Sequence, residues 1–153
     1  GKGRWGDANR DHWQQEEAAS RFGSLEEMLQ FSPLEQADFC GWHVVVDGDF
    51  RSEEAIYERY RKNYPTEWGD SAPEGSSASV GFYNTMFMWP MLVFGYENFM
   101  MLSMDPRFER IMEEFSEINR RVFRAFARLP VNFVICHDDI VLANGPVCSP
   151  QWM

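Results

Sequence analysis

The most regular pattern of apolar positions lies in the second half of the chain. Between Pro106 and Pro130, apolar side chains recur at steps of three and four residues, the spacing that places them on one face of a helix. Asp105 is suited to cap this helix and Pro106 to be its first residue, while Pro130 stops it. We therefore expect a long amphipathic helix whose buried stripe consists of Phe108, Ile111, Met112, Phe115, Ile118, Val122, Phe123 and Phe126.

The segment that follows this helix has a different pattern. Residues 131–136 are almost continuously apolar and do not alternate with polar residues. Strands that are buried on both faces of a parallel sheet have this pattern. A long amphipathic helix that leads directly into a buried strand is a step of an α/β protein. The sequence thus predicts an α/β fold with an interior strand at 131–136.

Shorter elements are predicted in the first half. Ser24 is suited to cap a helix while Glu27 reaches back to the same end, and Ser52 is suited to cap a second helix. Short runs at 42–46 and 78–82 predict strands or extended segments.

The Met- and Phe-rich stretch 85–104 predicts one or two short buried helices, broken near Pro90 and Gly95. The chain is expected to form a single partial domain. Its portion 1–80 is rich in helices and loops, and its portion 81–153 holds the βα units.

Composition and charge limit the classes of function. The 153 residues are 44% hydrophobic, enough for a core, and carry a formal net charge of −10. This charge repels phosphate backbones and anionic lipid, so neither nucleic acid nor a membrane surface is an expected partner. No run approaches the about 18 apolar residues of a membrane span. Three cysteines without framework spacing predict reduced thiols and a cytoplasmic protein.

The candidate catalytic residues follow the predicted interior strand directly. His137, Asp138 and Asp139 stand where α/β enzymes place functional groups, at the carboxyl end of a parallel strand. Two neighbouring carboxylates raise the pKa of one of them, which suits acid–base chemistry or the binding of a cationic group. Because adjacent side chains do not all share a face, we expect at most two of the three in one pocket. The structural alternative is that Asp138 caps the loop and His137 bonds to backbone.

No metal site is predicted from this sequence. His12, His43 and His137 are far apart, and neither a Cys-x-x-Cys nor a His-x-Cys pair occurs. A glycine-rich phosphate loop and a Gly-x-Ser-x-Gly elbow are also absent from the sequence.

From about Gly81 onward, the sequence resembles the uroporphyrinogen decarboxylase superfamily. The resemblance rests on a strand with its following loop, a Gly-x-x-x-Phe stretch, a Pro-led long helix, and a strand that ends in an acidic turn. It is closer to the corrinoid-dependent methyltransferase branch than to true decarboxylases, which favour a Phe-Asp-Ser-Trp type of strand end. The matching residues are Val80-Gly81-Phe82-Tyr83-Asn84, Gly95-Tyr96-Glu97-Asn98-Phe99, Asp138-Asp139-Ile140, Gly145-Pro146, Ser149-Pro150 and Trp152.

The resemblance implies a (β/α)₈ barrel that moves a methyl group between a corrinoid carrier and a thiol, a folate or a small methylated compound. It implies a catalytic role for Asp139, Asp138 and His137, and a place in the cofactor pocket for Tyr83 and Asn84. Members that use thiols bind zinc through a His-x-Cys pair and a later Cys, and none of these ligands is assigned in this sequence.

Barrels of this kind contain about 250 residues, so a chain of 153 is expected to be a fragment that is inactive alone. Either the rest of a longer protein, a homo-oligomer or a second chain would complete it. Two alternatives to methyl transfer stay open. One is decarboxylation of a tetrapyrrole with acidic side chains, although the Arg-rich and Ser-Asp-Ile motifs of that branch are not visible. The other is a non-catalytic half-barrel that serves as a subunit or binding module.

Overall fold

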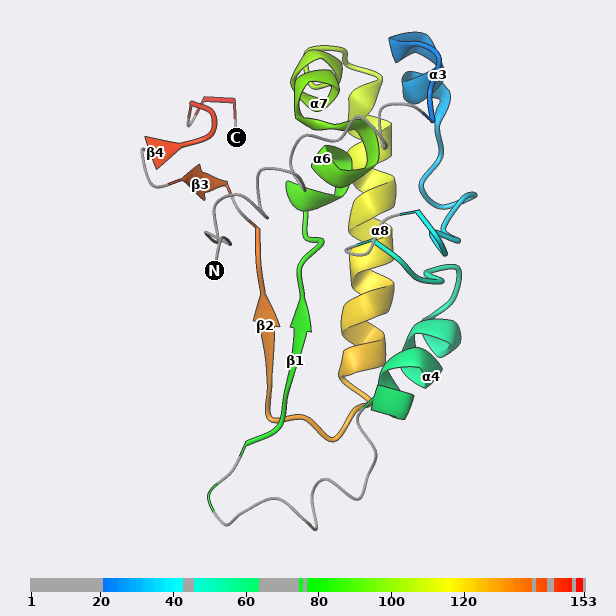
Figure 1. The fold of residues 1–153 in the computed structure, drawn as a ribbon, viewed down its shortest axis with the longest axis vertical. Helices are drawn as coiled ribbons and strands as arrows, with labels where there is room; N and C mark the ends of the chain where they lie inside the picture. The colour runs from blue at the N-terminus through cyan, green and yellow to red at the C-terminus, as the bar shows by residue number, and fades with distance from the viewer. Residues whose placement is uncertain are drawn as a thin grey trace, which may run out of the picture.

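A parallel strand pair and a long helix organise the part of the chain that the structure describes (Figure 1). The computed structural model describes residues 21–42, 46–63, 75, 77–138, 140–142, 145–149 and 151–152. The elements in chain order are α3 (Leu25–Gln30), α4 (Glu53–Asn63), β1 (Ser79–Phe82), α6 (Met88–Phe94), α7 (Tyr96–Leu102), α8 (Phe108–Phe126), β2 (Phe133–Cys136), β3 (Val141–Leu142) and β4 (Gly145–Pro146).

β1 and β2 lie side by side and run in the same direction, with α6, α7 and α8 in the connection between them. Parallel neighbours require such a crossover, so this is a βαβ unit. Both strands lie within the segments that the sequence predicted. Residues paired in register point to the same side of the sheet, so Val80 shares one face with Val134, and Gly81 shares the other with Ile135.

α8 is the predicted amphipathic helix. Its stripe is buried at Phe108, Ile111, Phe115, Ile118, Val122 and Phe126, while Phe123 stays 39% exposed. The helix begins at Phe108, later than expected, because residues 105–107 form a separate turn. In that turn the Asp105 carboxylate accepts a hydrogen bond from the Arg107 backbone N–H at 2.9 Å. Asp105 therefore caps the turn before the helix.

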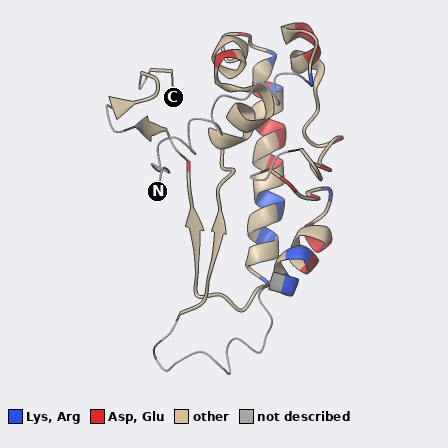
Figure 2. Ribbon diagram, viewed as in Figure 1, with Lys and Arg blue, Asp and Glu red and all other residues tan. Residues whose placement is uncertain are grey.

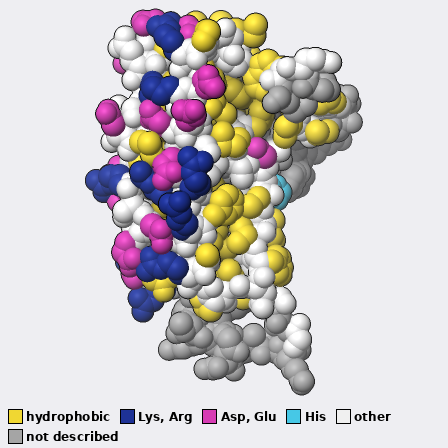
Figure 3. All heavy atoms as spheres, turned by 180° about the vertical axis from the view of Figure 1, so that it is seen from behind, with side chains coloured by type: hydrophobic (Ala, Val, Ile, Leu, Met, Phe, Trp, Pro, Cys, Tyr) yellow, Lys and Arg dark blue, Asp and Glu magenta, His cyan; other side chains and the backbone are white. Residues whose placement is uncertain are grey.

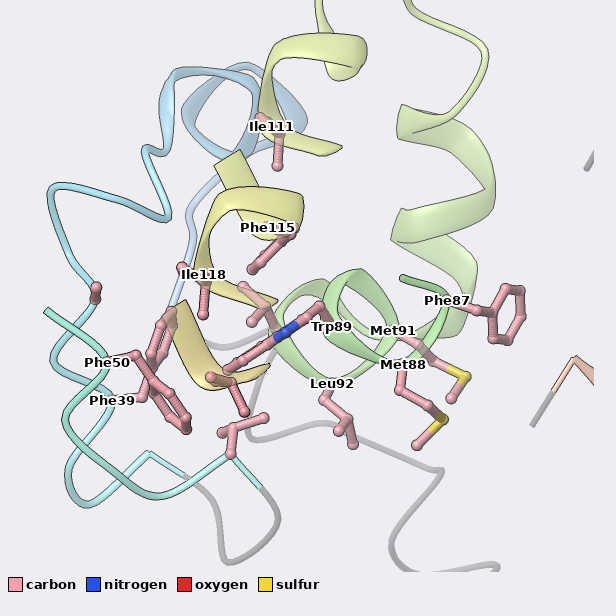
Figure 4. Packing of buried hydrophobic residues seen from close by; sticks show 14 of the residues in the cluster. Phe39, Phe50, Phe87, Met88, Trp89, Met91, Leu92, Ile111, Phe115 and Ile118 are labelled. Atoms are coloured by element: carbon pink, nitrogen blue, oxygen red, sulfur yellow. The ribbon is translucent and has the colours of Figure 1, made fainter. Parts of the chain in front are cut away.

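The core is centred on the fully buried Trp89 of α6 (Figure 4). Its indole stacks on Phe115 of α8 with ring centroids 5.4 Å apart, and contacts Phe39 and Phe50 from the loops before α4. The indole N–H donates to Oδ1 of the buried Asn119 at 2.8 Å, so both polar groups are satisfied within an apolar environment. The N-terminal loops, α6 and α8 thus share one core.

The predicted break at Pro90 is wrong. Pro90 lies in the first turn of α6, where a helix has no use for the missing backbone N–H, so the helix continues through it. The predicted break at Gly95 is confirmed: this residue separates α6 from α7 with φ at 83°, a conformation that glycine adopts without steric cost.

Both predicted serine caps are confirmed. Ser24 Oγ accepts from the Glu27 backbone N–H at 3.2 Å, and Ser52 Oγ accepts from that of Ala55 at 3.1 Å. The Glu27 carboxylate reaches back to the Gly23 N–H at 2.6 Å. The predicted strand at 42–46 falls mostly on residues that lie outside the described ones.

The predicted burial of the second strand is wrong. All four residues of β2 are exposed, including Phe133 at 49% and Ile135 at 44%. Among the described residues, only β1 pairs with β2. Neither strand carries a charged residue, and Figure 2 shows the coloured charges chiefly on the helices and the N-terminal loops. Seen from behind, apolar side chains gather beside the charged helical surface (Figure 3).

In the described part of the chain, no helix combines the length and the apolar character needed to cross a membrane.

Candidate functional site

Four of the five candidate residues come together at one edge of the strand pair. Tyr83 and Asn84 directly follow β1, and His137 and Asp138 directly follow β2. Because the two strands are adjacent and parallel, their carboxyl ends meet at the same edge. Asp139, the remaining candidate, lies outside the described residues. We refer to Tyr83, Asn84, His137 and Asp138 as the strand-end cluster.

An exposed pair of rings forms the outer part of this cluster. The Tyr83 and His137 rings lie 4.6 Å apart between centroids with 40° between their planes, and Tyr83 is 52% exposed. The backbone beneath them is fixed, since the His137 N–H donates to the Phe82 carbonyl at 3.1 Å and Thr85 Oγ1 donates to the His137 carbonyl at 3.1 Å. The two strand ends therefore present a pair of mutually tilted aromatic rings to solvent.

Asp138 is engaged with the start of α6. Its two carboxylate oxygens accept from the Phe87 backbone N–H at 3.0 Å each, and its Oδ1 also accepts from the Met88 N–H at 2.8 Å. Phe87 stands at the N-cap position and offers no side-chain cap of its own. A carboxylate at a helix N-terminus is stabilised by these N–H groups and by the helix dipole. Asp138 thus caps the start of α6 and not its own loop, which the structural alternative had expected it to cap, and its role in acid–base chemistry stays a prediction.

The two residues predicted to bind a cofactor differ in accessibility. Tyr83 is half exposed, whereas Asn84 is only 2% exposed and is enclosed by the protein chain. Of this pair, only the tyrosine offers its side chain to a ligand that arrives from solvent.

An apolar surface continues from the ring pair down the strands. Phe133 and Ile135 alternate with His137 along β2 and share its face, opposite to that of Val134. Neither residue was predicted as a neighbour of the site, because the whole strand was assigned to the interior. Their positions two and four residues before His137 are the signal that could have found them.

Within the described ranges, no group of three or more His, Cys, Asp or Glu side chains is arranged to hold a metal ion. Cys40, Cys136 and Cys148 are free thiols, and the first two are exposed.

A separate cleft of about 460 Å³ lies beside α3. On the wall of this cleft, the Arg21 guanidinium lies over the Trp42 ring, 4.6 Å from the ring centroid. None of the predicted site residues is part of the described lining of the cleft. The described lining consists of Arg21, Phe22, Glu27, Gln30, Phe31, Gln36 and Trp42.

Comparison of the chain with models of protein families, with curated proteins and with solved structures finds no match in any of the three. The resemblance to the uroporphyrinogen decarboxylase superfamily consequently stays a prediction, and the strand-end cluster has to be interpreted from its own geometry.

Proposed function

We propose that this chain supplies part of the ligand site of a uroporphyrinogen decarboxylase-like (β/α)₈ barrel that transfers a methyl group through a corrinoid carrier. The observation that carries the proposal is the strand-end cluster. A parallel βαβ unit gathers four of the five candidate residues at the carboxyl ends of its strands, where barrel enzymes bind their ligands.

The distribution of apolar side chains on the two faces supports a barrel. Val80 and Phe82 of β1 are buried, and Phe82 contacts Phe126 of α8, so the helices cover this face along β1, whereas Val134 on the same face of β2 is 37% exposed. Phe133 and Ile135 on the other face are exposed. In a barrel, helices cover the outer face of the strands and further strands enclose the inner one, whereas a doubly wound sheet carries helices on both faces. Additional strands, from the same protein, a second copy or another chain, would cover this surface.

The chemistry of the cluster favours a corrinoid over a tetrapyrrole that carries several carboxylates. Tyr83 and His137 offer two exposed rings, tilted 40° to each other, to a conjugated ligand, and no Lys or Arg belongs to the cluster. A ligand with many carboxylates requires cationic partners, and Asp138 would repel it. The amide side chains of a corrinoid carry no such charge.

Ligand titration tests this proposal. Hydroxocobalamin and uroporphyrin are titrated into the chain in parallel, and binding is followed by absorbance and calorimetry. We expect saturable binding of the corrinoid that weakens about tenfold or more in Tyr83→Ala, since an aromatic stacking contact is lost. Tyr96→Ala is the matched control, because Tyr96 is similarly exposed at 41% but lies on α7. Tighter binding of uroporphyrin, or no corrinoid binding, would contradict the proposal.

A second candidate is a binding module without catalysis, which the engagement of Asp138 with backbone favours. Demethylation of methylcobalamin by an added thiol separates the two candidates. Turnover that depends on the chain supports the enzyme. Because the chain is expected to be inactive alone, corrinoid binding without turnover supports the module only when the strands that would complete the barrel are present. For either candidate we propose a cytoplasmic setting and a corrinoid protein or a small methyl donor or acceptor as the partner. Any zinc of the thiol-using type would be held by residues outside this segment.

A further inference from the structure

We infer that Asp138 is a positioning residue whose carboxylate holds the Tyr83–His137 ring pair in place by joining the end of β2 to the start of α6. The inference concerns the geometry of the strand-end cluster and does not require a particular ligand. Only its consequence for corrinoid binding rests on the proposed function.

The start of α6 lacks a cap from its own segment. The residue at its N-cap position, Phe87, provides no side-chain acceptor. Asp138 provides one from 51 residues further along the chain, through contacts of 2.8 to 3.0 Å. Hydrogen bonds to a charged acceptor are stronger than those between neutral groups. The link therefore fixes two distant segments relative to each other.

The two rings lie between the ends of the strands and the contact of Asp138 with α6. Tyr83 lies between β1 and Phe87, and His137 directly precedes Asp138. The His137 carbonyl is also held by Thr85, which belongs to the same connection as Tyr83. The two rings thus stand on two short segments that the carboxylate draws together. When the carboxylate is removed, the connection from β1 to α6 can shift away from the end of β2, and the ring contact loosens.

A positioning role for Asp138 differs from simple stabilisation of the fold. A cap at another helix stabilises the fold without any contact with these segments. Ser52 is such a cap, because its hydroxyl accepts from the Ala55 N–H at 3.1 Å at the start of α4. Loss of the Ser52 hydroxyl destabilises the protein because a helix N-terminus loses its cap, as in the Asp138 variants. Ser52→Ala is therefore the matched control.

The experiment follows the imidazole resonances of His137 by NMR, which the Tyr83 ring current shifts. The resonances are assigned by their loss in His137→Gln, and Tyr83→Ala gives their position without the ring. We expect Asp138→Ala to move them at least halfway toward the Tyr83→Ala position. Asp138→Asn retains one acceptor oxygen and should move them less. Ser52→Ala should leave them in place although it lowers the midpoint of thermal unfolding. Should Asp138→Ala fail to fold, Asp138→Asn decides the matter. Wild-type resonances in a folded Asp138 variant would overturn the inference.

Corrinoid binding gives a second readout. With hydroxocobalamin as the probe, Asp138→Ala should weaken the dissociation constant about tenfold, while Ser52→Ala should change it less than about twofold. If the wild-type chain binds no corrinoid, the proposed function fails while the NMR result on ring geometry still stands. If it binds and Asp138→Ala binds equally well with displaced resonances, the ring pair has no part in the corrinoid site.

Discussion

The core around Trp89 and the strand pair β1–β2 are both rich in apolar residues, yet they differ in how those residues are covered. Trp89, Phe115 and Ile118 are completely buried, and the polar groups among them are paired. On β2, Phe133 and Ile135 remain nearly half exposed. The core receives side chains from helices and loops on several sides, whereas β2 has β1 on one side and, among the described residues, no strand on the other. An apolar run thus indicates a surface that burial would stabilise. Whether this surface is buried depends on which other segments pack against it.

We expect the largest loss of stability from a substitution at Trp89. Trp89→Ala should lower the free energy of unfolding by about 3–5 kcal/mol, because it leaves a cavity against Phe115 and removes the donor to Asn119. Urea unfolding followed by circular dichroism measures the loss. Phe123→Ala is the control, since this side chain is 39% exposed and should cost clearly less. Equal losses in the two variants would contradict the distinction between a closed core and an open surface.

An intermediate effect is predicted where the N-terminal loops join α8. The Glu114 carboxylate accepts from Ser32 Oγ at 2.7 Å and from the Leu34 N–H at 3.2 Å, and pairs with Arg110. Glu114→Ala should lower the free energy of unfolding by about 1–3 kcal/mol, because these donors lose their acceptor. Urea unfolding at neutral pH gives this loss, and Glu113→Ala on the exposed side of α8 should show little change.

The same residue predicts a dependence on pH. Partial burial raises the pKa of Glu114, but the hydrogen bonds from Ser32 and Leu34 and the contact with Arg110 outweigh burial and leave the pKa below its ordinary value. A lowered pKa in the folded state contributes stability that is present above the ordinary pKa of glutamate and is lost as the pH falls through the lowered value. The difference between wild type and Glu114→Ala should therefore shrink in acid. A difference that stays constant down to the acid limit of folding would refute this assignment.

The smallest effect on stability is predicted for the strand pair. Ile135→Lys should change the free energy of unfolding by less than about 0.5–1 kcal/mol, because the side chain is already 44% exposed. It should also reduce self-association of the chain, since an uncharged apolar edge strand is an association site that a lysine blocks. Unfolding in urea and sedimentation velocity measure the two effects.

Met104→Lys is the matched control for this variant, because it adds the same charge at an apolar side chain that is 77% exposed and lies beyond α7. A loss of stability at Ile135 comparable to that at Trp89 would show that the exposed face is covered in solution.

Local patterns were sufficient for many individual elements. The stripe from Phe108 to Phe126, the caps Ser24 and Ser52 and the break at Gly95 were predicted, because each depends on residues within a few positions of one another. Pro90 was misjudged because the effect of a proline depends on its place in the helix, and the sequence did not show where α6 begins.

For the candidate site, too, local positions were predicted from the sequence and long-range contacts were not. The position of His137 and Asp138 after a strand followed from the sequence, as did that of Tyr83 and Asn84. Their meeting at one edge required the parallel pairing of β1 with β2, which joins segments 54 positions apart, as Ser79 and Phe133 are. The contact of Asp138 with α6 likewise depends on residues about 50 positions apart. No periodicity encodes such a pair.

For this protein, the amino-acid sequence was enough to locate the long helix, the two helix caps and the segments that form β1 and β2, because these features depend on near neighbours and on the fixed periods of helix and strand. The folded structure was needed to show that Asp138 caps the start of α6, that Asn84 is buried while Tyr83 is exposed, and that the side chains of β2 are exposed. These outcomes depend on which distant segments come into contact, and that is set by the packing of the whole chain.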